Sequence, residues 1–429
     1  MIDGVKERTK VALVWSALLR DRMLPYWHNT TMNSRGGYQV YDPGDRSWRA
    51  QIKAMIKGDE DRDQNESPRG LVSQARLLWV FSHAHLLGYS TPEHDYLNAA
   101  AHGYSYLIET MLDRECGGFY WKTDVNRGVV EPHKILYGQS MAIYALVEYH
   151  RASGLSEPLE YARSAYETAQ QRLRDEINGG FNEHCERDFT PLTGTGERLP
   201  GMPDIVGFKS GDALLHWMEA LTELYSESKD ASVRDSLAEA VELLCTKFYP
   251  PNVSECCEYR LADWKAADEV SGISHGHIVE FAWLLLHAQQ TLGKPCDWDH
   301  FEALLRHSLR YGFDRARGGF YFRGKAHEPA CDTTKFWWVQ AEGLSALTDA
   351  VAQFDSEEYN QPLTQLVDWI RNYQIRSDDG VWIVSTDASG RPQNVKKAGE
   401  WKAAYHEVRA ITKFVHAFAP QSQYDRRQQ

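Results

Sequence analysis

Apolar residues recur with the helical period over long segments of the chain, and short glycine-aromatic stretches separate these segments. The runs HKILYGQSMAIYALVEYHRA (133–152) and FWWVQAEGLSALTDAVAQF (336–354) are examples. The chain between two glycine-aromatic stretches is long enough for one returning helix and one outgoing helix. The pattern therefore predicts an all-α protein built from helical hairpins.

The glycine-aromatic stretches repeat at a long interval. They read RGGYQVYDPGD, CGGFYWKTD, GGFNEHCERD, GGFYFRG and DDGVWIVSTD, and they begin near residues 36, 117, 179, 318 and 379. The intervals of 81, 62, 139 and 61 residues indicate that the longest spans two units. We expect CCEYRLADW, residues 256–264, to be the missing member. Gly-Gly allows a tight turn, so each stretch is predicted to form a short β-hairpin-like loop.

Six such units predict twelve helices in an (α/α)6 barrel. An open helical solenoid is the alternative, but six units suffice to close a ring, whose axis would bury many of the 14 Trp and 22 Tyr residues. No linker rich in Pro, Gly or Ser divides the chain, so we expect one catalytic domain over residues 1–429, with a flexible tail from about residue 420. The polar segment 57–70 is predicted to be a loop.

Composition narrows the classes of partner. The 429 residues are 42% apolar, enough for a large core, and carry a net charge of −13 without a Lys/Arg cluster. Nucleic acid and anionic membranes require a basic face, so neither is an expected partner. A small-molecule substrate remains, bound by a monomer or a homodimer.

The cysteines and the N-terminus bear on the compartment. Seven cysteines without a CxxC pair favour reduced thiols, and a cytoplasmic location is expected. The segment KERTKVALVWSALLR has a short apolar run that contains Trp15 and lacks a small-residue cleavage site, so we interpret it as an amphipathic first helix rather than a signal peptide. No apolar run reaches the length of a membrane span.

Standard motifs for phosphate transfer, hydride transfer, HExxH zinc chemistry and serine hydrolysis are absent from the sequence. Several polar residues stand out instead, because they interrupt otherwise apolar helical runs. They are Arg76, Tyr137, His216, Glu219, His277, Glu280, Glu342, His406 and Arg409, with Trp401 beside the last two, and Asp212, Trp337 and Trp338 lie in the same segments. His277 and Glu280 lie three residues apart, on one face at the start of a predicted helix.

These residues have two interpretations. A histidine on an apolar face is often a hydrogen-bonded core residue, and buried Arg and Glu can simply pair. However, imidazole or charged residues recur in one helix of successive units, so they would converge at the axis of a closed ring. We therefore favour a shared active site, in which tryptophans beside Arg, His and Glu suit the apolar faces and the hydroxyls of a sugar.

The segments that carry these residues resemble the N-acylglucosamine 2-epimerase superfamily, especially its cellobiose 2-epimerase and mannose isomerase or epimerase branches. The matching segments are QARLLWVFS, KILYGQSMAIYALVEYHRASG, LLHWMEAL, GHIVEFAWLLL, FWWVQAEGL and WKAAYHEVR. They match in order and spacing over nearly the whole chain. The resemblance implies an (α/α)6 barrel that acts at C2 of a free reducing sugar without metal or nicotinamide.

The resemblance also implies roles for individual residues. His277 and His406 would be the acid/base pair that acts through a cis-enediolate, since imidazole serves both roles near neutral pH. Arg76 would stabilise the oxyanion, and Glu280 would orient His277 or assist ring opening. Contacts with the sugar are implied for Tyr137 and His216, and Trp338 and Trp401 would be walls of the site. We also expect the substrate to be bound by Asp212, Glu219, Trp337, Glu342 and Arg409.

One departure from the family pattern affects the substrate. The cellobiose and mannose branches usually have Asn four residues before the histidine of HxxEA, whereas this chain has Asp212, which cannot donate a hydrogen bond when ionised. Mannose epimerisation, cellobiose epimerisation and mannose isomerisation all stay open. So do an inverting glycoside hydrolase, with carboxylates from Asp212, Glu219, Glu280 or Glu342, and a catalytically silent sugar-binding module.

Overall fold

The computed structural model describes residues 2–40, 68–192, 204–267, 270 and 272–420. The predicted loop at 57–70 lies outside this part of the chain except for its last three residues, and the predicted flexible tail lies outside it from residue 421. Two compact units make up the chain. Unit 1 comprises residues 1–24, 208–394 and 406–429, and unit 2 comprises residues 25–207 and 395–405. The single-domain organisation stays a prediction.

Helices dominate both units, as predicted. Unit 1 contains α1 (Ile2–Leu18), α8 (Gly211–Ser228), α9 (Ala231–Leu243), α10 (His275–Thr291), α11 (Trp298–Tyr311), α12 (Trp337–Phe354), α13 (Glu357–Trp369) and, from its second residue, α14 (Tyr405–Phe418). Unit 2 contains α2 (Leu24–Thr31) from its second residue, α4 (Leu71–Leu86), α5 (Tyr96–Tyr106), α6 (Leu136–Ser153) and α7 (Glu157–Arg172). Over the described residues, with α1 and α2 counted as one helix joined by a π-turn, there are twelve helices, the predicted number.

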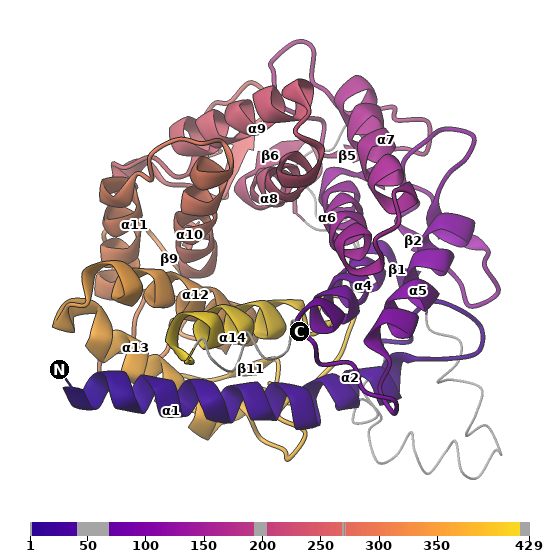
Figure 1. The fold of residues 1–429 in the computed structure, drawn as a ribbon. Coiled ribbons are helices and arrows are strands. Elements are labelled where there is room, and N and C mark those ends of the chain that lie inside the picture. Colours follow the sequence, from indigo (N-terminus) through magenta and orange to yellow (C-terminus); the bar gives the residue numbers. More distant parts are fainter. Residues whose placement is uncertain (1, 41–67, 193–203, 268–269, 271, 421–429) are drawn as a thin grey trace, which may run out of the picture. The chain divides into compact units, whose positions relative to one another are not determined.

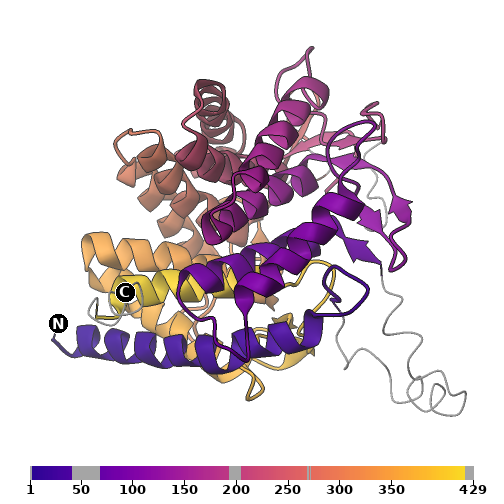
Figure 2. The same ribbon diagram turned by 45° about the vertical axis from the view of Figure 1, so that its right-hand side comes forward.

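Helices of two kinds alternate along the chain. The core helices α4, α6, α8, α10 and α12 are buried on almost every side, whereas the flanking helices α5, α7, α9, α11 and α13 bury one face. In unit 1, α10 packs against α8 and α12, and each core helix lies beside the flanking helix that follows it (Figure 1). In unit 2, α4 packs against α5 and α6, and α6 against α7; these are the violet to magenta helices of Figure 2.

A short strand precedes each core helix and pairs with a strand in the turn that follows the next flanking helix. The antiparallel pairs in unit 2 are β1 (Arg69–Gly70) with β2 (Lys122–Thr123), and β4 (Lys134–Ile135) with β5 (His184–Cys185). Those in unit 1 are β6 (Phe208–Ser210) with β7 (Tyr259–Leu261), β8 (Ile273–Ser274) with β9 (Arg323–Gly324), and β10 (Lys335–Phe336) with β11 (Ser385–Thr386). Two further strands add a third strand to a sheet: β3 (Val129–Glu131) pairs with β2, and β12 (Pro392–Asn394) pairs with β11. Because β7 lies within CCEYRLADW, the expectation that this segment is a sixth turn is confirmed.

Three of the glycine-aromatic turns begin with an aspartate that caps them. In the turn Asp113–Phe119, the Asp113 carboxylate accepts hydrogen bonds from two backbone N–H groups, and Asp175 and Asp314 do the same in their turns. Gly117 and Gly118 have φ angles of 83° and 64°, in the left-handed region that glycine tolerates best. An antiparallel bridge from Leu112 to Phe119 closes the turn. These turns are the predicted hairpin-like loops.

Glutamines from the core helices clamp three of these turns. Gln340 on α12 accepts a hydrogen bond from Phe320 N at 2.7 Å and donates one to Phe320 O at 2.8 Å. Gln139 on α6 makes the same pair of bonds with Phe119, and Gln74 on α4 with Tyr38. The N–H and C=O of these turn residues, which their strand neighbours do not bind, thus obtain both hydrogen bonds from one amide side chain.

The first N–H of each core helix is also satisfied by a turn. Leu71, Leu136, Gly211, His275 and Trp337 donate to the carbonyls of Trp121, Glu183, Glu258, Phe322 and Val384 at 2.9–3.0 Å. A helix N-terminus leaves its first N–H groups without intrahelical partners, so these bonds fix where each core helix begins. Polar side chains in the first turns of these helices thereby acquire defined positions.

The predicted first helix is confirmed over the described residues, and the reduced state of the cysteines stays an expectation. None of the seven cysteines, all of which are described, forms a disulfide. The segment interpreted as a first helix forms α1 and continues into a π-turn. No helix among the described residues combines the length and the apolar character that crossing a bilayer requires.

The Gln340 clamp predicts the effect of one substitution. Gln340→Leu orphans the backbone N–H and C=O of Phe320, and each buried orphan costs about 1–3 kcal/mol of unfolding free energy. Gln361→Leu on the exposed face of α13 is the matched control and is expected to change stability little. Urea denaturation of both variants measures the difference. Equal midpoints for the two variants would show that the clamp does not stabilise the turn.

Candidate active site

Four helices of unit 1 carry most of the predicted site residues. Asp212, His216 and Glu219 lie on α8, His277 and Glu280 on α10, Trp337, Trp338 and Glu342 on α12, and His406 and Arg409 on α14. The starts of α8 and α10 are capped by serines: Ser210 accepts a hydrogen bond from Ala213 N, and Ser274 accepts one from His277 N at 3.3 Å.

A single guanidinium joins three buried carboxylates. Arg409 donates to Glu219, and its Nη2 lies 2.8 Å from Glu280 Oε1 and 2.8 Å from Glu342 Oε1. The three glutamates come from three different helices and are only 2%, 1% and 0% exposed. Carboxylates this deeply buried require a cation, so Arg409 holds α8, α10, α12 and α14 of unit 1 together.

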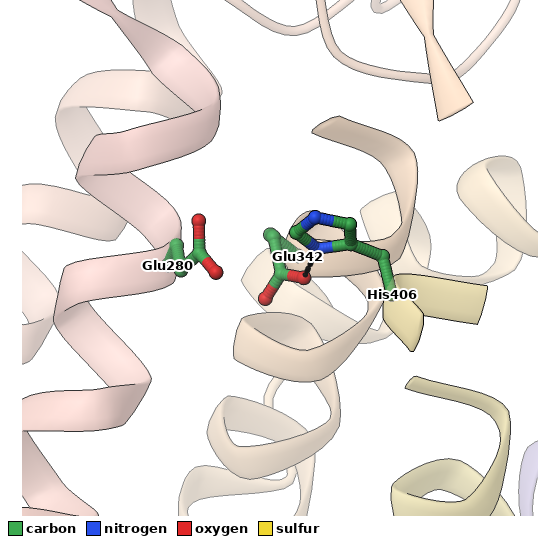
Figure 3. A group of neighbouring side chains, drawn as sticks. All are labelled: Glu280, Glu342 and His406. Carbon is green, nitrogen blue, oxygen red and sulfur yellow. Dashed lines mark hydrogen bonds and ion pairs between the residues drawn. The ribbon is translucent and has the colours of Figure 1, made fainter. Parts of the chain in front are cut away.

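His406 is oriented by the same cluster. Its Nδ1 lies 2.6 Å from Glu342 Oε1, as the dashed line in Figure 3 shows, while Glu280 faces this pair from α10. Trp283 Nε1 donates to the other oxygen of Glu342 at 3.0 Å. The ionised Glu342 can only accept, so Nδ1 of His406 carries the proton in this bond. Nε2 is then the nitrogen of His406 that can exchange a proton with a substrate.

Glu280, Glu342 and His406 also have the donor types of a metal site. One donor atom from each lies within 4.8 Å of the others. Arg409, however, donates to both glutamates from one nitrogen at 2.8 Å, and its positive charge stands where a metal ion would bind. These residues therefore bind the guanidinium of Arg409 rather than a metal ion, because a metal would have to displace this guanidinium.

His277 is oriented by a residue that the sequence analysis did not select. Its Nδ1 lies 2.7 Å from Glu258 Oε2, and the other oxygen of Glu258 accepts a hydrogen bond from Ser274 N at 3.0 Å. Glu280 was expected to orient His277 or to assist ring opening, but its described hydrogen bond comes from Arg409. The sequence signal that could have identified Glu258 is its place in the degenerate turn. Its carbonyl accepts from the first N–H of a core helix, as the carbonyl of Phe322 does in the next turn.

Asp212 lies between two imidazoles. Its Oδ1 is 3.3 Å from His216 Nε2 and 3.6 Å from His277 Nε2. The other ring nitrogen of His216 is 2.8 Å from Glu219 Oε2. Both nitrogens of each ring therefore face a carboxylate, and His216 is buried.

Trp338 lies against both candidate acid/base residues. Its ring centroid is 4.8 Å from that of His277 and 6.1 Å from that of His406. The Trp338 side chain is only partly buried, whereas Trp337, 6.4 Å from the His406 ring, is buried. A partly exposed indole beside two imidazoles provides the apolar surface on which a sugar ring can stack.

The carboxylates shift the protonation of this cluster. Burial lowers the pKa of His277, but Glu258 and then Asp212 raise it, to about 9 overall. Burial likewise lowers the pKa of His216, and hydrogen bonds with Asp212 and Glu219 raise it to about 10. Both imidazoles are therefore cationic at neutral pH.

The buried glutamates Glu280 and Glu342 shift in opposite directions. Burial, together with the charge of Glu342, raises the pKa of Glu280. Burial also opposes ionisation of Glu342, but Arg409 and His406 outweigh it and lower the pKa of this carboxyl. Glu342 is thus the ionised partner, and Glu280 is the carboxyl that most readily keeps a proton.

Three predicted residues come together in unit 2. Arg76 on α4 donates to Tyr137 Oη at 2.7 Å and to the carbonyl of Trp401. Tyr137 packs edge-on against the Trp401 ring, with centroids 5.8 Å apart. The guanidinium also lies 5.3 Å from the Tyr405 ring. Arg76 is buried, and Trp401 is partly exposed.

Comparisons with known proteins identify the family. The family model described as N-acylglucosamine 2-epimerase matches residues 58–410. A cellobiose 2-epimerase of Dictyoglomus turgidum is 25% identical over 403 residues, covering 91% of this chain and 94% of the relative. A D-mannose isomerase of Marinomonas mediterranea is 23% identical and covers 82% and 88%. The solved cellobiose 2-epimerase of Spirochaeta thermophila is 26% identical with a TM-score of 0.82, covering 96% and 98%.

The chain belongs to the N-acylglucosamine 2-epimerase family. It is an enzyme of the carbohydrate isomerase class, to which its named relatives also belong. The structural match confirms the predicted all-α fold class, the (α/α)6 barrel. The resemblance drawn from the sequence motifs is therefore confirmed.

The carboxylate cluster predicts that Arg409 is essential for stability. Arg409→Leu leaves three buried glutamates without their cation, and the expected loss of unfolding free energy is about 3–5 kcal/mol. Arg371→Leu is the control, because among the described residues this half-exposed arginine pairs with Asp368 at 3.8 Å, a contact worth about 0–1 kcal/mol. Thermal unfolding compares the two variants. If Arg409→Leu unfolded within about a degree of Arg371→Leu, the central role of Arg409 would be refuted.

Proposed function

We propose that the protein is a 2-epimerase or aldose-ketose isomerase of a free reducing sugar. Mannose, glucose and a cellobiose-type β-1,4 disaccharide are the substrates to consider, because the named relatives are cellobiose 2-epimerases and D-mannose isomerases. The family membership supports the reaction class. The partly exposed Trp338 supports a sugar as the ligand.

The observation that carries this proposal is the arrangement of two histidines against one tryptophan. His277 and His406 each bind a glutamate through Nδ1, at 2.7 Å and 2.6 Å, and both rings lie against Trp338. A carboxylate at Nδ1 fixes the tautomer of an imidazole and directs its Nε2 to the substrate. Two imidazoles beside one stacking surface suit the removal of a proton from a sugar carbon and its return from the other side.

The proposed reaction proceeds through an enediolate. One histidine removes the proton from C2 of the open-chain aldose, and the resulting cis-enediolate receives a proton from the other histidine. Protonation at C2 gives the epimer, and protonation at C1 gives the ketose. Arg76, placed in the reaction by the family resemblance of its segment, stabilises the enediolate oxygen. Glu280, which retains a proton most readily, is suited to assist ring opening.

The glycoside hydrolase alternative receives less support. An inverting hydrolase places two carboxyl groups about 6.5–9.5 Å apart on opposite sides of the scissile bond. Glu280 and Glu342 instead have oxygens within 4.8 Å of each other, and both bind Arg409. Such carboxylates hold a guanidinium between them and leave no room there for a glycosidic bond.

The remaining expectations stay predictions. We propose that the protein acts in the cytoplasm, as a monomer or a homodimer, without metal or nicotinamide. The unpaired cysteines support a reducing compartment. The cation that Arg409 provides supports metal-independent activity, so dialysis against EDTA is expected to leave turnover unchanged.

Product analysis in D2O tests the reaction. Purified protein is incubated with mannose, cellobiose and a polysaccharide, and NMR follows the products. The expected result is deuterium at C2 of an epimer, or at C1 of a ketose, because an imidazole exchanges its proton with solvent. An unlabelled epimer would overturn the enediolate mechanism, and cleavage of a glycosidic bond without isomerised sugar would favour the hydrolase.

Substitution of the two histidines tests their roles. His277→Gln and His406→Gln are each expected to lower kcat by about 10²–10⁴-fold while leaving the fold intact, because each variant removes one partner of proton transfer. His287→Gln, on the same helix as His277 but 43% exposed, is the control and is expected to retain wild-type kcat. Near-normal rates in both active-site variants, with folded protein by circular dichroism, would contradict the assignment of His277 and His406 as the proton-transfer pair.

A further inference from the structure

Asp212 is placed to act on two imidazoles through one oxygen. It lies in the first turn of α8, and its Oδ1 is 3.3 Å from His216 Nε2 and 3.6 Å from His277 Nε2. Glu219 and Glu258 bind the opposite nitrogens of these rings. Three carboxylates and two imidazoles therefore alternate in a chain, and Asp212 is the member that both rings share.

The two contacts of His277 differ in kind. Its 2.7 Å contact with Glu258 is a hydrogen bond, which fixes the ring. The 3.6 Å separation from Asp212 exceeds hydrogen-bond length, so Asp212 attracts a positive charge on the ring without holding the proton on Nε2. A proton on Nε2 is then stabilised and still available for transfer.

The charged groups that act most strongly on His277 are carboxylates, and one cation, Arg323, acts on the Glu258 that binds it. Glu258 faces it from the segment before β7, Asp212 from α8, and Glu280 from its own helix. His216 on α8 shares Asp212, and α12 contributes the uncharged ring of Trp338. Carboxylates within this range favour an imidazolium over a neutral ring, in accord with the raised pKa of His277.

We propose that Asp212 is a positioning residue that keeps His277 in its imidazolium form in the resting enzyme, so that His277 enters the reaction as the acid and His406 as the base. The acid and base roles of the two histidines rest on the proposed function. The effect of Asp212 on the protonation of His277 concerns the resting protein alone. It goes beyond the family resemblance, in whose relevant branches Asn is usual at this position.

The proton balance follows from this assignment. His406 Nε2 takes the proton of the C2–H bond, and the electron pair of that bond enters the enediolate. The N–H bond at Nε2 of His277 then breaks. A C–H bond forms at C2 to give the epimer, or at C1 to give the ketose, in which case the proton of the C2 hydroxyl moves to the oxygen on C1. His277 ends neutral and His406 ends cationic; exchange with water returns a proton to His277 and removes one from His406.

A high-pH limit of activity follows. His277 must carry a proton to act as the acid, so kcat/KM falls as pH rises through the pKa of His277. Asp212→Asn removes the attracting charge and keeps the shape of the side chain. The pKa of His277 then falls, and the high-pH limb of the profile moves to lower pH by about 1–3 units, the usual effect of an opposite charge at this range.

The resting protein is tested first, without any sugar. NMR titration of the 15N-labelled histidines, assigned with the His277→Gln and His216→Gln spectra, is expected to show His277 titrating well above the ordinary value of about 6.5. Asp212→Asn should lower this midpoint by at least about one pH unit. Glu223→Gln, another carboxylate of α8, which contacts the exposed His287, is the control and should leave it unchanged. A wild-type midpoint near 6.5, or no shift in Asp212→Asn, would overturn the proposal.

The kinetic arm then separates positioning from sugar contact. If Asp212 sets the protonation of His277, Asp212→Asn moves the high-pH limb of kcat/KM while Glu223→Gln does not. If Asp212 only binds a sugar hydroxyl, KM changes and the limb stays in place, which contradicts the proposal. Should no sugar be isomerised by the wild-type protein, the proposed function fails, and the NMR titration still decides whether Asp212 holds the charge of His277.

Discussion

The buried guanidinium of Arg409 is the interaction on which the geometry of the candidate site in unit 1 depends. Three glutamates from α8, α10 and α12 converge on it, and each would be unfavourable in the core as an uncompensated charge. Because the three helices must present their carboxylates to one cation, their rotations and axial positions are coupled. Glu342, held in place by Arg409, in turn fixes the orientation of His406 through the hydrogen bond with Nδ1.

The turns supply the second constraint, because they decide where each core helix begins. A carbonyl from a turn satisfies the first N–H of the helix, and at three turns a glutamine of the core helix binds the turn backbone in return. At α8 and α10, the carbonyl bond and a serine cap hold the first turns of the helix. His277 and Glu280 occupy this part of α10, and Asp212 and His216 the same part of α8.

The two histidines differ in their electrostatic surroundings although each binds a glutamate at Nδ1. His406 shares its glutamate with Arg409, whose positive charge offsets the carboxylate. His277 faces Glu258 and Asp212, and no cation contacts either of its ring nitrogens among the described interactions. This asymmetry is the basis of the proposed division into an acid member and a base member, which a two-sided proton transfer requires.

Much of this organisation could be predicted from the sequence, because its signals are local. The Gly-Gly turns, the apolar helical runs and the interruptions by His406, Glu342 and Arg409 depend on neighbouring residues, and the motifs that contain them led to the family. The partners of these residues could not be predicted. Glu258 looked like an ordinary member of a degenerate turn, yet it orients His277. Trp283 looked like a core residue, yet it donates a hydrogen bond to Glu342. Asp212 was visible as a departure from the family pattern, but its position between two imidazoles comes from the packing of α8 against α10. Sequence periodicity determines which face of a helix is buried, whereas tertiary packing alone decides which side chain of a neighbouring element meets it.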